Sequence, residues 1–239
     1  PLLRAAHKKF AEHPGKRIAV LGSYGKTRMK ELLNTVLGSK MDVATTPGNK
    51  NVVISHARWS KTLKGTEDVL IIEYGEGQPG DISKLASLSA PTYAVITGLA
   101  PNHLDHYRTL DALKDDFRNI EEFVKPENIY INDDKTGLAK GFSSAASIYD
   151  QDGIDGWRVS NVNVEVTGIS FKLSKDGQLI NVKSGLLGRH NIGPLCAVAA
   201  IALRLGFKIQ EIEHAMTLTR PFEHRMQPRQ VNGAWSIDD

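Results

Sequence analysis

The chain has 239 residues, of which 41% are hydrophobic and 24% are charged, and its formal net charge is +3. These values are typical of a globular protein that can bury a substantial core. The small net charge, with no block of five or six like charges, argues against a nucleic-acid partner. No apolar run reaches the roughly 18 residues of a membrane-spanning helix, and the N-terminus lacks the apolar core of a signal peptide. We therefore expect a cytoplasmic protein without a membrane span, in which the single cysteine, Cys196, is a small core residue.

A short helix is expected over residues 2–11, and the segment that follows it carries the most informative pattern in the chain. Aliphatic residues 18–21 lead into a glycine-containing turn, and apolar residues then recur at every third or fourth position as far as Leu37. A buried strand, a glycine turn and a helix form a geometry that binds phosphate, because backbone N–H groups point into the turn. We predict that this turn binds a nucleotide through Gly22, Ser23, Tyr24, Gly25, Lys26 and Thr27.

Within the turn, Lys26 is expected to reach terminal phosphate oxygens and Thr27 to ligate Mg²⁺. The longer pattern GxxxxGK(S/T) is not met, because its first glycine falls on Val20. The shorter GxxGKT that remains also occurs in ordinary turns between a strand and a helix, and that interpretation stays open. The position between a buried strand and an amphipathic helix favours the nucleotide site.

Strands and helices continue to alternate up to about residue 132. Strands are expected at 41–44, 68–73, 93–97 and 128–132, and helices at 52–63 and 111–124. This alternation predicts an α/β fold with a mostly parallel, P-loop-type sheet and helices on both of its faces.

Two side chains beyond strand ends are candidate partners of Lys26 in catalysis and candidate metal ligands. Glu73 closes the strand 68–73, and His103 lies in the loop after the strand 93–97. Ligands bind beyond the carboxyl edge of such sheets. Glu73 suits Mg²⁺, which prefers oxygen ligands, whereas His103 is equally well explained as a loop histidine. The glycine-rich loop over residues 75–81 is either a turn, in which Asp81 caps the next helix, or a loop that admits a substrate.

The pattern changes after about residue 145. Short alternating strands are expected at 162–166, 169–173 and 179–182, with a hairpin signal at Lys175-Asp176-Gly177. They predict a small antiparallel β appendage over residues 160–184. Helices are expected from Gly188-Arg189-His190-Asn191 to about Leu205 and over 209–218, and a last strand over 231–237.

Taken in this order, eight segments resemble the motifs of the Mur ligase family, the ATP-dependent amino-acid and peptide ligases of peptidoglycan synthesis. They are LGSYGKTRMKELL, TPGNKN, IIEYGEGQPGDI, ITGLAPNHLDHYRTL, IYINDD, LLGRHNIGPLCAVAAIALRLG, RPFEHRMQ and SIDD. The resemblance is to the central ATP-binding domain of the family and covers nearly the whole chain. It is greatest to the branch that adds D-alanyl-D-alanine.

The resemblance implies that the cofactors are ATP and Mg²⁺. Lys26 would neutralise the β- and γ-phosphates, Thr27 and Glu73 would bind Mg²⁺, and His103 would serve a second metal position. The implied reaction converts a substrate carboxylate to an acyl phosphate, which an incoming amine attacks to form an amide. Phosphoryl transfer of this kind depends on positioning and charge neutralisation, which suits the predicted residues.

Four further residues gain a role only through the resemblance. Asn49 would lie near the γ-phosphate and the acyl acceptor, and Asn191 near the adenine. Arg225 and Asp239 would lie near the ribose and the phosphates.

The chain differs from the family pattern at several positions. Where the family has a carbamylated lysine that helps to hold a second Mg²⁺, this chain has Phe117 or Arg118. An expected asparagine is Gly98, a second asparagine of the Arg-His-Asn motif is Pro194, and a hydroxyl residue of the glycine loop is Arg28. These differences leave open whether one or two Mg²⁺ ions bind. They also admit a non-catalytic nucleotide-binding module as an alternative function.

The resemblance also sets an expectation about domains. The enzymes of the family have an N-terminal domain for the UDP-sugar and a C-terminal domain that closes over ATP, so residues 1–239 would be the central domain alone, with both neighbours outside the chain. The full-length protein would join a UDP-sugar-peptide-like substrate to an amino acid or dipeptide, and the isolated domain would not ligate. A folylpolyglutamate-type or other acyl-phosphate ligase is the alternative on the same scaffold, and EYGEGQPGDI and SIDD favour the first reading.

Overall fold

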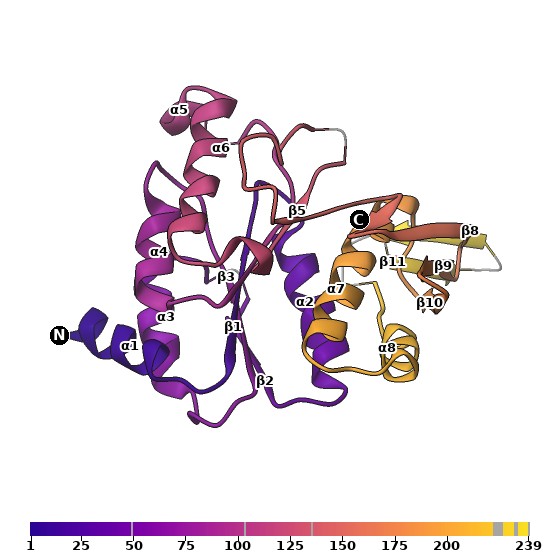
Figure 1. Ribbon diagram of the computed structural model, residues 1–239, viewed down its shortest axis with the longest axis horizontal. Helices are drawn as coiled ribbons and strands as arrows, with labels where there is room; N and C mark the ends of the chain where they lie inside the picture. The colour runs from indigo at the N-terminus through magenta and orange to yellow at the C-terminus, as the bar shows by residue number, and fades with distance from the viewer. Residues whose placement is uncertain (49, 103, 135, 222–226, 232–233, 239) are drawn as a thin grey trace. The chain divides into compact units, whose positions relative to one another are not determined.

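The structure is a computed structural model that describes residues 1–239 except 49, 103, 135, 222–226, 232–233 and 239. The chain folds into two compact units (Figure 1). The first comprises residues 1–34 and 40–148, and the second comprises residues 35–39 and 149–239. Each unit has its own sheet strands and helices, which are taken in turn below.

The first unit is built on a five-stranded parallel sheet. Its strands are β1 (Lys16–Leu21), β2 (Val43–Thr45), β3 (Val69–Glu73), β4 (Tyr93–Ile96) and β5 (Ile129–Asn132). They pair in the order β5-β4-β1-β3-β2, and every pair is parallel. The runs of β1, β3 and β4 are buried almost throughout, as expected for strands that are covered on both faces.

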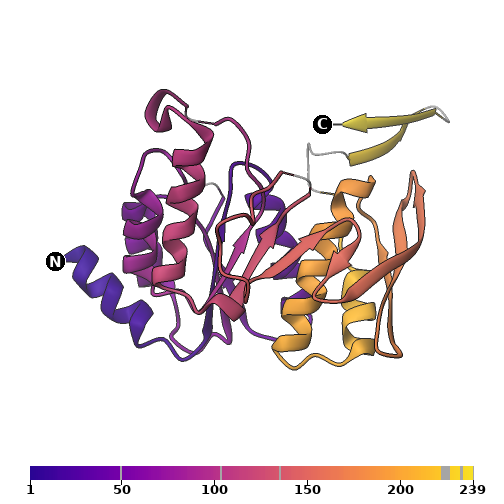
Figure 2. The same cartoon turned by 45° about the horizontal axis from the view of Figure 1, so that its top comes forward.

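Helices cover both faces of this sheet (Figures 1 and 2). They are α1 (Leu2–Ala11), α2 (Lys26–Gly38), α3 (Val53–Trp59), α4 (Asp81–Ser89), α5 (Leu104–Tyr107) and α6 (Leu110–Arg118), with 3-10 turns at Ser60–Thr62, Asn119–Glu122 and Pro126–Asn128. Residues of α1, α3, α4 and α6 form one hydrophobic core with alternate residues of the strands, such as Leu21, Ile72 and Ile96. Helix α2 lies against the opposite face (Figure 1).

The second unit contains an antiparallel meander. Its strands are β6 (Ser147–Asp150), β7 (Gly153–Ile154), β8 (Trp157–Glu165), β9 (Gly168–Lys175) and β10 (Gln178–Ser184). From β6 onward each strand pairs antiparallel with the next, and the β8–β9 register shifts between Ser160 and Asn163. Buried residues of β9 and β10 alternate with more exposed ones, so one face of the meander supplies a core.

Two helices and a hairpin complete the second unit. A 3-10 turn at Arg189–Asn191 leads into α7 (Ile192–Arg204), which is followed by α8 (Ile209–Met216). Cys196 of α7 is fully buried, and burial raises the pKa of its thiol, so it is a core residue as predicted. Strands β11 (Gln227–Val231) and β12 (Ala234–Asp238) pair with each other as a separate antiparallel ribbon.

The predicted α/β class, with a mostly parallel sheet and an antiparallel part, is confirmed. The strand predicted at 231–237 corresponds to β12 (Ala234–Asp238), and the prediction missed the strand β11 (Gln227–Val231) that pairs with it. The antiparallel part also begins earlier than predicted, at Ser147, since β6 and β7 are too short to give a clear alternating pattern. None of the helices in the described ranges has the length and apolar character needed to cross a lipid bilayer.

Candidate functional site

The carboxyl ends of β1 and β4 lie side by side where the strand order of the parallel sheet reverses. After β1 the chain continues to β2 at one edge, whereas after β4 it continues to β5 at the other. Connections that leave neighbouring strands in opposite directions open a crevice between them, which is where ligands bind in folds of this kind. The backbone N–H of Ser23, after β1, donates to the carbonyl of Gly98, after β4, at 2.9 Å. The predicted nucleotide-binding loop therefore lies at this crevice.

The glycine loop is a tight turn, and its first position accommodates only glycine. Gly22 has φ +134°, and a Cβ there would lie 3.0 Å from the backbone nitrogen of Gly98. Gly25 also has a positive φ, of +76°, directly before α2 begins at Lys26. The loop thus precedes a helix N-terminus, where the helix dipole favours an anion. The buried hydroxyl of Ser23 has no hydrogen-bond partner within the described residues, so it is available to a ligand.

Thr27 and Glu73 meet beside this loop. Glu73 is the last residue of β3 and is 3% exposed. Its Oε1 accepts a hydrogen bond from the Thr27 hydroxyl at 3.4 Å. Its Oε2 lies 3.2 Å from Lys30 Nζ but accepts no well-directed hydrogen bond from the described part of the chain. A hydroxyl and a carboxylate in this arrangement are the kind of oxygen ligands that Mg²⁺ takes, so the residues present fit a magnesium ion.

Lys26 is engaged by a carboxylate that the sequence did not single out. Its ammonium donates to the carbonyl of Gly22 at 2.5 Å and to Glu76 Oε1 at 3.0 Å, and it lies 2.8 Å from Glu76 Oε2. The side chains of Lys26 and Glu76 are 13% and 2% exposed. The sequence indicates only that Glu76 belongs to a glycine-rich loop, where a glutamate is ordinarily solvated.

Lys30 is a second charged residue that sequence reasoning missed. It is 1% exposed, and its ammonium donates to the carbonyls of Thr46 and Gly48 at 3.1 and 2.6 Å. Together with the ion pair to Glu73, these contacts tie α2 to the end of β3 and to the loop after β2. The available signal was its place four residues after Lys26, within the apolar stripe of an amphipathic helix.

The glycine-rich loop over residues 75–81 is fixed at its centre by Asp81. The predicted capping role of this residue is wrong, because Gly80 is the N-cap of α4 and Asp81 is its first residue. The Asp81 carboxylate instead accepts hydrogen bonds from the backbone of Gly77 and Gln78 at 3.1 and 3.0 Å. These bonds hold the turn that follows Glu76.

Asp116 of α6 holds the end of the same loop. It is 4% exposed, accepts from the backbone of Gly80 at 2.8 Å, and accepts from the Tyr107 hydroxyl at 2.8 Å. Burial and this hydrogen bond raise the pKa of Tyr107, so its hydroxyl remains a donor. The loop that carries Glu76 is therefore anchored to α5 and α6.

His56 holds the backbone of Glu73 in place. Its Nε2 donates to the Glu73 backbone carbonyl at 3.0 Å, and the ring is fully buried. Burial lowers the pKa of His56 to about 4, against the smaller effect of the hydrogen bond with the Glu73 backbone. A neutral histidine thus fixes the end of β3 near neutral pH.

Four of the predicted site residues lie outside the described residues: Asn49, His103, Arg225 and Asp239. Asn191 is described and belongs to the second unit. It is 3% exposed, and its Nδ2 donates to the carbonyl of Leu187 at 2.6 Å. Its Oδ1 has no hydrogen-bond partner among the described residues, which leaves one acceptor for a ligand.

Neither residue at the position of the family's lysine can replace it as a metal ligand. The Phe117 ring is fully buried in the core of the first unit. Arg118 is partly exposed and pairs with Asp115 at 3.2 Å. The described part of the chain contains no group of three His, Cys, Asp or Glu residues able to hold a metal.

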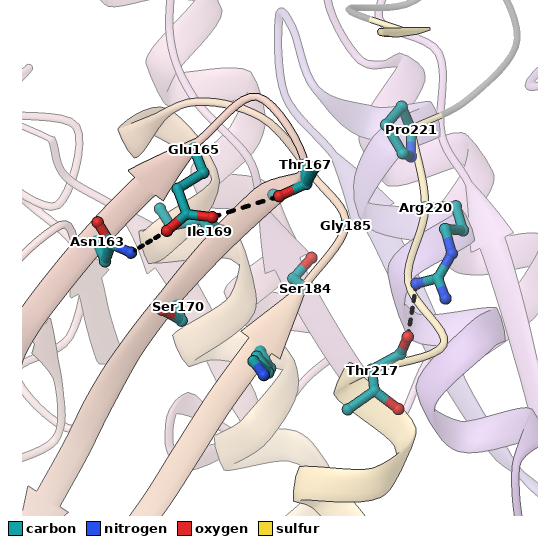
Figure 3. Close-up of a pocket in the computed structure, with 12 residues that line it drawn as sticks. Asn163, Glu165, Thr167, Ile169, Ser170, Ser184, Gly185, Thr217, Arg220 and Pro221 are labelled. Atoms are coloured by element: carbon teal, nitrogen blue, oxygen red, sulfur yellow. Dashed lines mark hydrogen bonds between the residues drawn. The ribbon is translucent and has the colours of Figure 1, made fainter. Parts of the chain in front are cut away.

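The second unit has an open groove of about 790 Å³ (Figure 3). Its polar side chains bond to one another or to backbone: Asn163 and Thr167 donate to Glu165 at 2.7 and 3.4 Å, and Arg220 donates to the Thr217 carbonyl at 2.5 Å. None of the residues that line it comes from the glycine loop or from the segments after β3 and β4. We assign the groove no role, because Glu165 and Arg220, two of its charged residues, already have partners within the unit.

The parallel sheet and the glycine loop at its switch point define a class of α/β folds in which ligands bind at the carboxyl edge of the sheet. The family model described as the Mur ligase middle domain matches residues 20–202, so the chain belongs to this family.

Relatives and solved structures agree with this assignment. The UDP-N-acetylmuramoyl-tripeptide–D-alanyl-D-alanine ligase of Treponema pallidum is 28% identical over 211 residues, which cover 86% of this chain and 44% of that protein. A MurF structure from Acinetobacter baumannii has a TM-score of 0.87 at 21% identity and covers 100% of this chain and 53% of that one. The structure of the MurF ligase of Thermotoga maritima in complex with ADP has a TM-score of 0.84 at 24% identity. The match covers 99% of this chain and 56% of that one. The chain thus spans about half the length of the proteins that it matches.

Proposed function

We propose that this chain is the Mg²⁺- and ATP-binding central domain of an amide-forming ligase. The observation that carries the proposal is the meeting of Thr27 and Glu73, at 3.4 Å, beside the glycine loop and Lys26. The family and the ADP complex of a structural relative support the nucleotide as ligand. We place residues 1–239 in a longer ligase with a UDP-sugar domain before them and a further domain after them.

The proposed reaction has two steps. An oxygen of a substrate carboxylate attacks the γ-phosphorus of ATP, the bond to the β-phosphate oxygen breaks, and ADP leaves. The amine of the second substrate then attacks the acyl carbon, phosphate leaves, and the amine nitrogen loses a proton to give the amide. The first step develops charge on the phosphate oxygens, which Lys26 and the N–H groups of the glycine loop are placed to neutralise.

Thr27 and Glu73 would hold the magnesium ion in this site. When bound, Mg²⁺ neutralises phosphate charge and orients the nucleotide. Glu73 is kept in place from two sides, by Lys30 on its carboxylate and by His56 on its backbone carbonyl. We propose the γ-phosphate region for Asn49, a second metal position for His103, the adenine for Asn191, and the ribose and phosphates for Arg225 and Asp239.

The proposed substrates follow the named relatives, which join a UDP-N-acetylmuramoyl-tripeptide to D-alanyl-D-alanine. The test uses the full-length protein that carries this chain, with that tripeptide substrate, the dipeptide, ATP and Mg²⁺. Repeated turnover of ATP to ADP should require both substrates, and Lys26→Met should abolish it. ADP release that does not depend on the two substrates would contradict the proposal.

One observation favours a non-catalytic nucleotide-binding module as the second candidate. The position of the family's lysine is taken by Phe117, which belongs to the hydrophobic core and offers no ligand. A module of this kind would bind nucleotide and form no ADP with any pair of a carboxylate and an amine. ADP formation with a pteroyl-glutamate substrate and glutamate, but not with the muramoyl peptide, would instead indicate a folylpolyglutamate-type ligase.

A further inference from the structure

Four charged side chains near the glycine loop form two ion pairs, each between a lysine and a glutamate. Lys26 lies 2.8 Å from Glu76, and Lys30 lies 3.2 Å from Glu73. All four side chains are at most 13% exposed. Two lysines and two glutamates contribute no net charge, so these four residues do not by themselves attract a polyanion.

The Lys26–Glu76 pair places a carboxylate where the nucleotide phosphates are proposed to bind. An ammonium group has three hydrogens, and that of Lys26 faces the carbonyl of Gly22 and both oxygens of Glu76. A phosphate that approaches Lys26 must therefore either displace Glu76 or lie next to it. If the phosphate displaces Glu76, the buried carboxylate loses its counter-charge. If the phosphate lies next to Glu76, the two anions repel each other.

Glu76 is not free to leave this position. Its Oε1 also accepts from the Asn102 side chain at 3.3 Å. The loop around it is fastened by Asp81, which binds the backbone of Gly77 and Gln78, and by Asp116, which binds the backbone of Gly80. The repulsion is thus built into the folded loop.

We infer that Glu76 makes this site selective for metal-complexed nucleotide, because the phosphates of free nucleotide would meet the Glu76 carboxylate beside Lys26 with no metal charge to offset the repulsion. The inference rests on the proposed function and adds a specificity-determining residue to it. The added charge of Mg²⁺ offsets the phosphate charge that Glu76 opposes. Glu76 therefore weakens binding of the free nucleotide far more than binding of the magnesium complex.

The test is calorimetric titration with a non-hydrolysable ATP analogue, in excess Mg²⁺ and in excess EDTA. The proteins are the wild type, Glu76→Gln and Glu76→Ala. Glu76→Gln keeps the size of the side chain, and Glu76→Ala provides a second variant without the carboxylate in case the glutamine amide disturbs the loop. Glu12→Gln is the matched control, because Glu12 is 66% exposed and makes only a 3.9 Å contact to Lys8. Thermal unfolding confirms that each variant is folded.

The ratio of the dissociation constants in EDTA and in Mg²⁺ should fall at least tenfold in both Glu76 variants and stay unchanged in Glu12→Gln. The fall should come from tighter binding in EDTA. An unchanged ratio, or binding weakened equally in both conditions, would overturn the inference and leave the proposed function standing. Failure of the wild type to bind the magnesium complex would instead reject the proposed function, and the inference with it.

Discussion

The side chain of Tyr24, in the loop after β1, occupies the space above the backbone of Gly98, in the loop after β4. A Cβ at position 98 would lie 2.5 Å from the Tyr24 hydroxyl oxygen and 2.6 Å from its Cε1. The asparagine that the family pattern predicts at position 98 is therefore incompatible with Tyr24 in this position. Gly98 is explained by the packing of two loops at the site, and it carries no evidence of lost catalysis.

This relationship predicts a compensating pair. Gly98→Asn should destabilise the protein by about 1–3 kcal/mol, because the new side chain overpacks the crevice. In a Tyr24→Ser background the same substitution should cost less, although the φ of +156° at position 98 should leave a residual cost. Urea unfolding of the four proteins of this double-mutant cycle measures the coupling. Strictly additive effects would show that the Tyr24 side chain does not limit the space at position 98.

A second prediction concerns Lys30. Lys30→Met leaves the Glu73 carboxylate buried without its counter-charge, so it should destabilise the protein by about 3–5 kcal/mol. Combining it with Glu73→Gln should restore most of this loss, since the carboxylate is then gone. Lys8→Met, at a position whose side chain is 73% exposed, is the control. Denaturant unfolding in which the double variant is no more stable than Lys30→Met would contradict the assignment.

A third prediction concerns Glu67, two residues before β3 begins at Val69. Although burial opposes it, hydrogen bonds from His13 and from the backbone of Lys64 and Gly65 lower the pKa of Glu67 to about 2, from 4.5. A carboxyl whose folded pKa is depressed stabilises the fold above its unfolded pKa and loses this contribution as the pH falls. The free energy of unfolding should therefore drop between about pH 4.5 and pH 2, by about 2–3 kcal/mol.

Unfolding curves at several pH values should show this drop in the wild type and not in Glu67→Gln. The variant should also be less stable at pH 7. An identical pH profile in both proteins would mean that Glu67 is not held as described.

A fourth prediction concerns His56, which titrates in a different range. Its folded pKa of about 4 lies below its ordinary value of 6.5, so protons bind more tightly to the unfolded chain. The stability that neutral His56 contributes is complete above about pH 6.5 and is lost as the pH falls towards 4, by about 3 kcal/mol. His56→Gln should remove this dependence, and a wild type whose unfolding free energy is flat between pH 6.5 and 4.5 would contradict it.

Much of the first unit could be predicted from the sequence because its signals are local. The apolar runs that end at Leu21 and Glu73 are short and continuous, which is typical of buried strands. The glycines at 22 and 25 mark the turn between the first of these runs and α2. Parallel strands bring their carboxyl ends to one edge, so the approach of Glu73 to Thr27 followed from fold class alone.

The missed features depend on contacts between distant segments. Lys30 and Glu76 are residue types that are ordinarily exposed, and only the folded chain shows that each has a buried partner of opposite charge. The sequence analysis predicts one strand where β11 and β12 pair antiparallel, although Asn232-Gly233, a dipeptide that favours turns, separates the two strands in the sequence. The roles proposed for Asn49, His103, Arg225 and Asp239 stay predictions from resemblance.

Nucleotide binding by this chain, with and without Mg²⁺, tests the central claim most directly. Calorimetric titration with a non-hydrolysable ATP analogue should show binding that is tighter in Mg²⁺ than in EDTA. Lys26→Met should weaken it at least tenfold, Glu73→Gln should weaken binding of the magnesium complex, and Lys8→Met should leave it unchanged. A folded wild type that binds no nucleotide at millimolar concentration, or a Lys26→Met variant that binds as well as the wild type, would contradict the account.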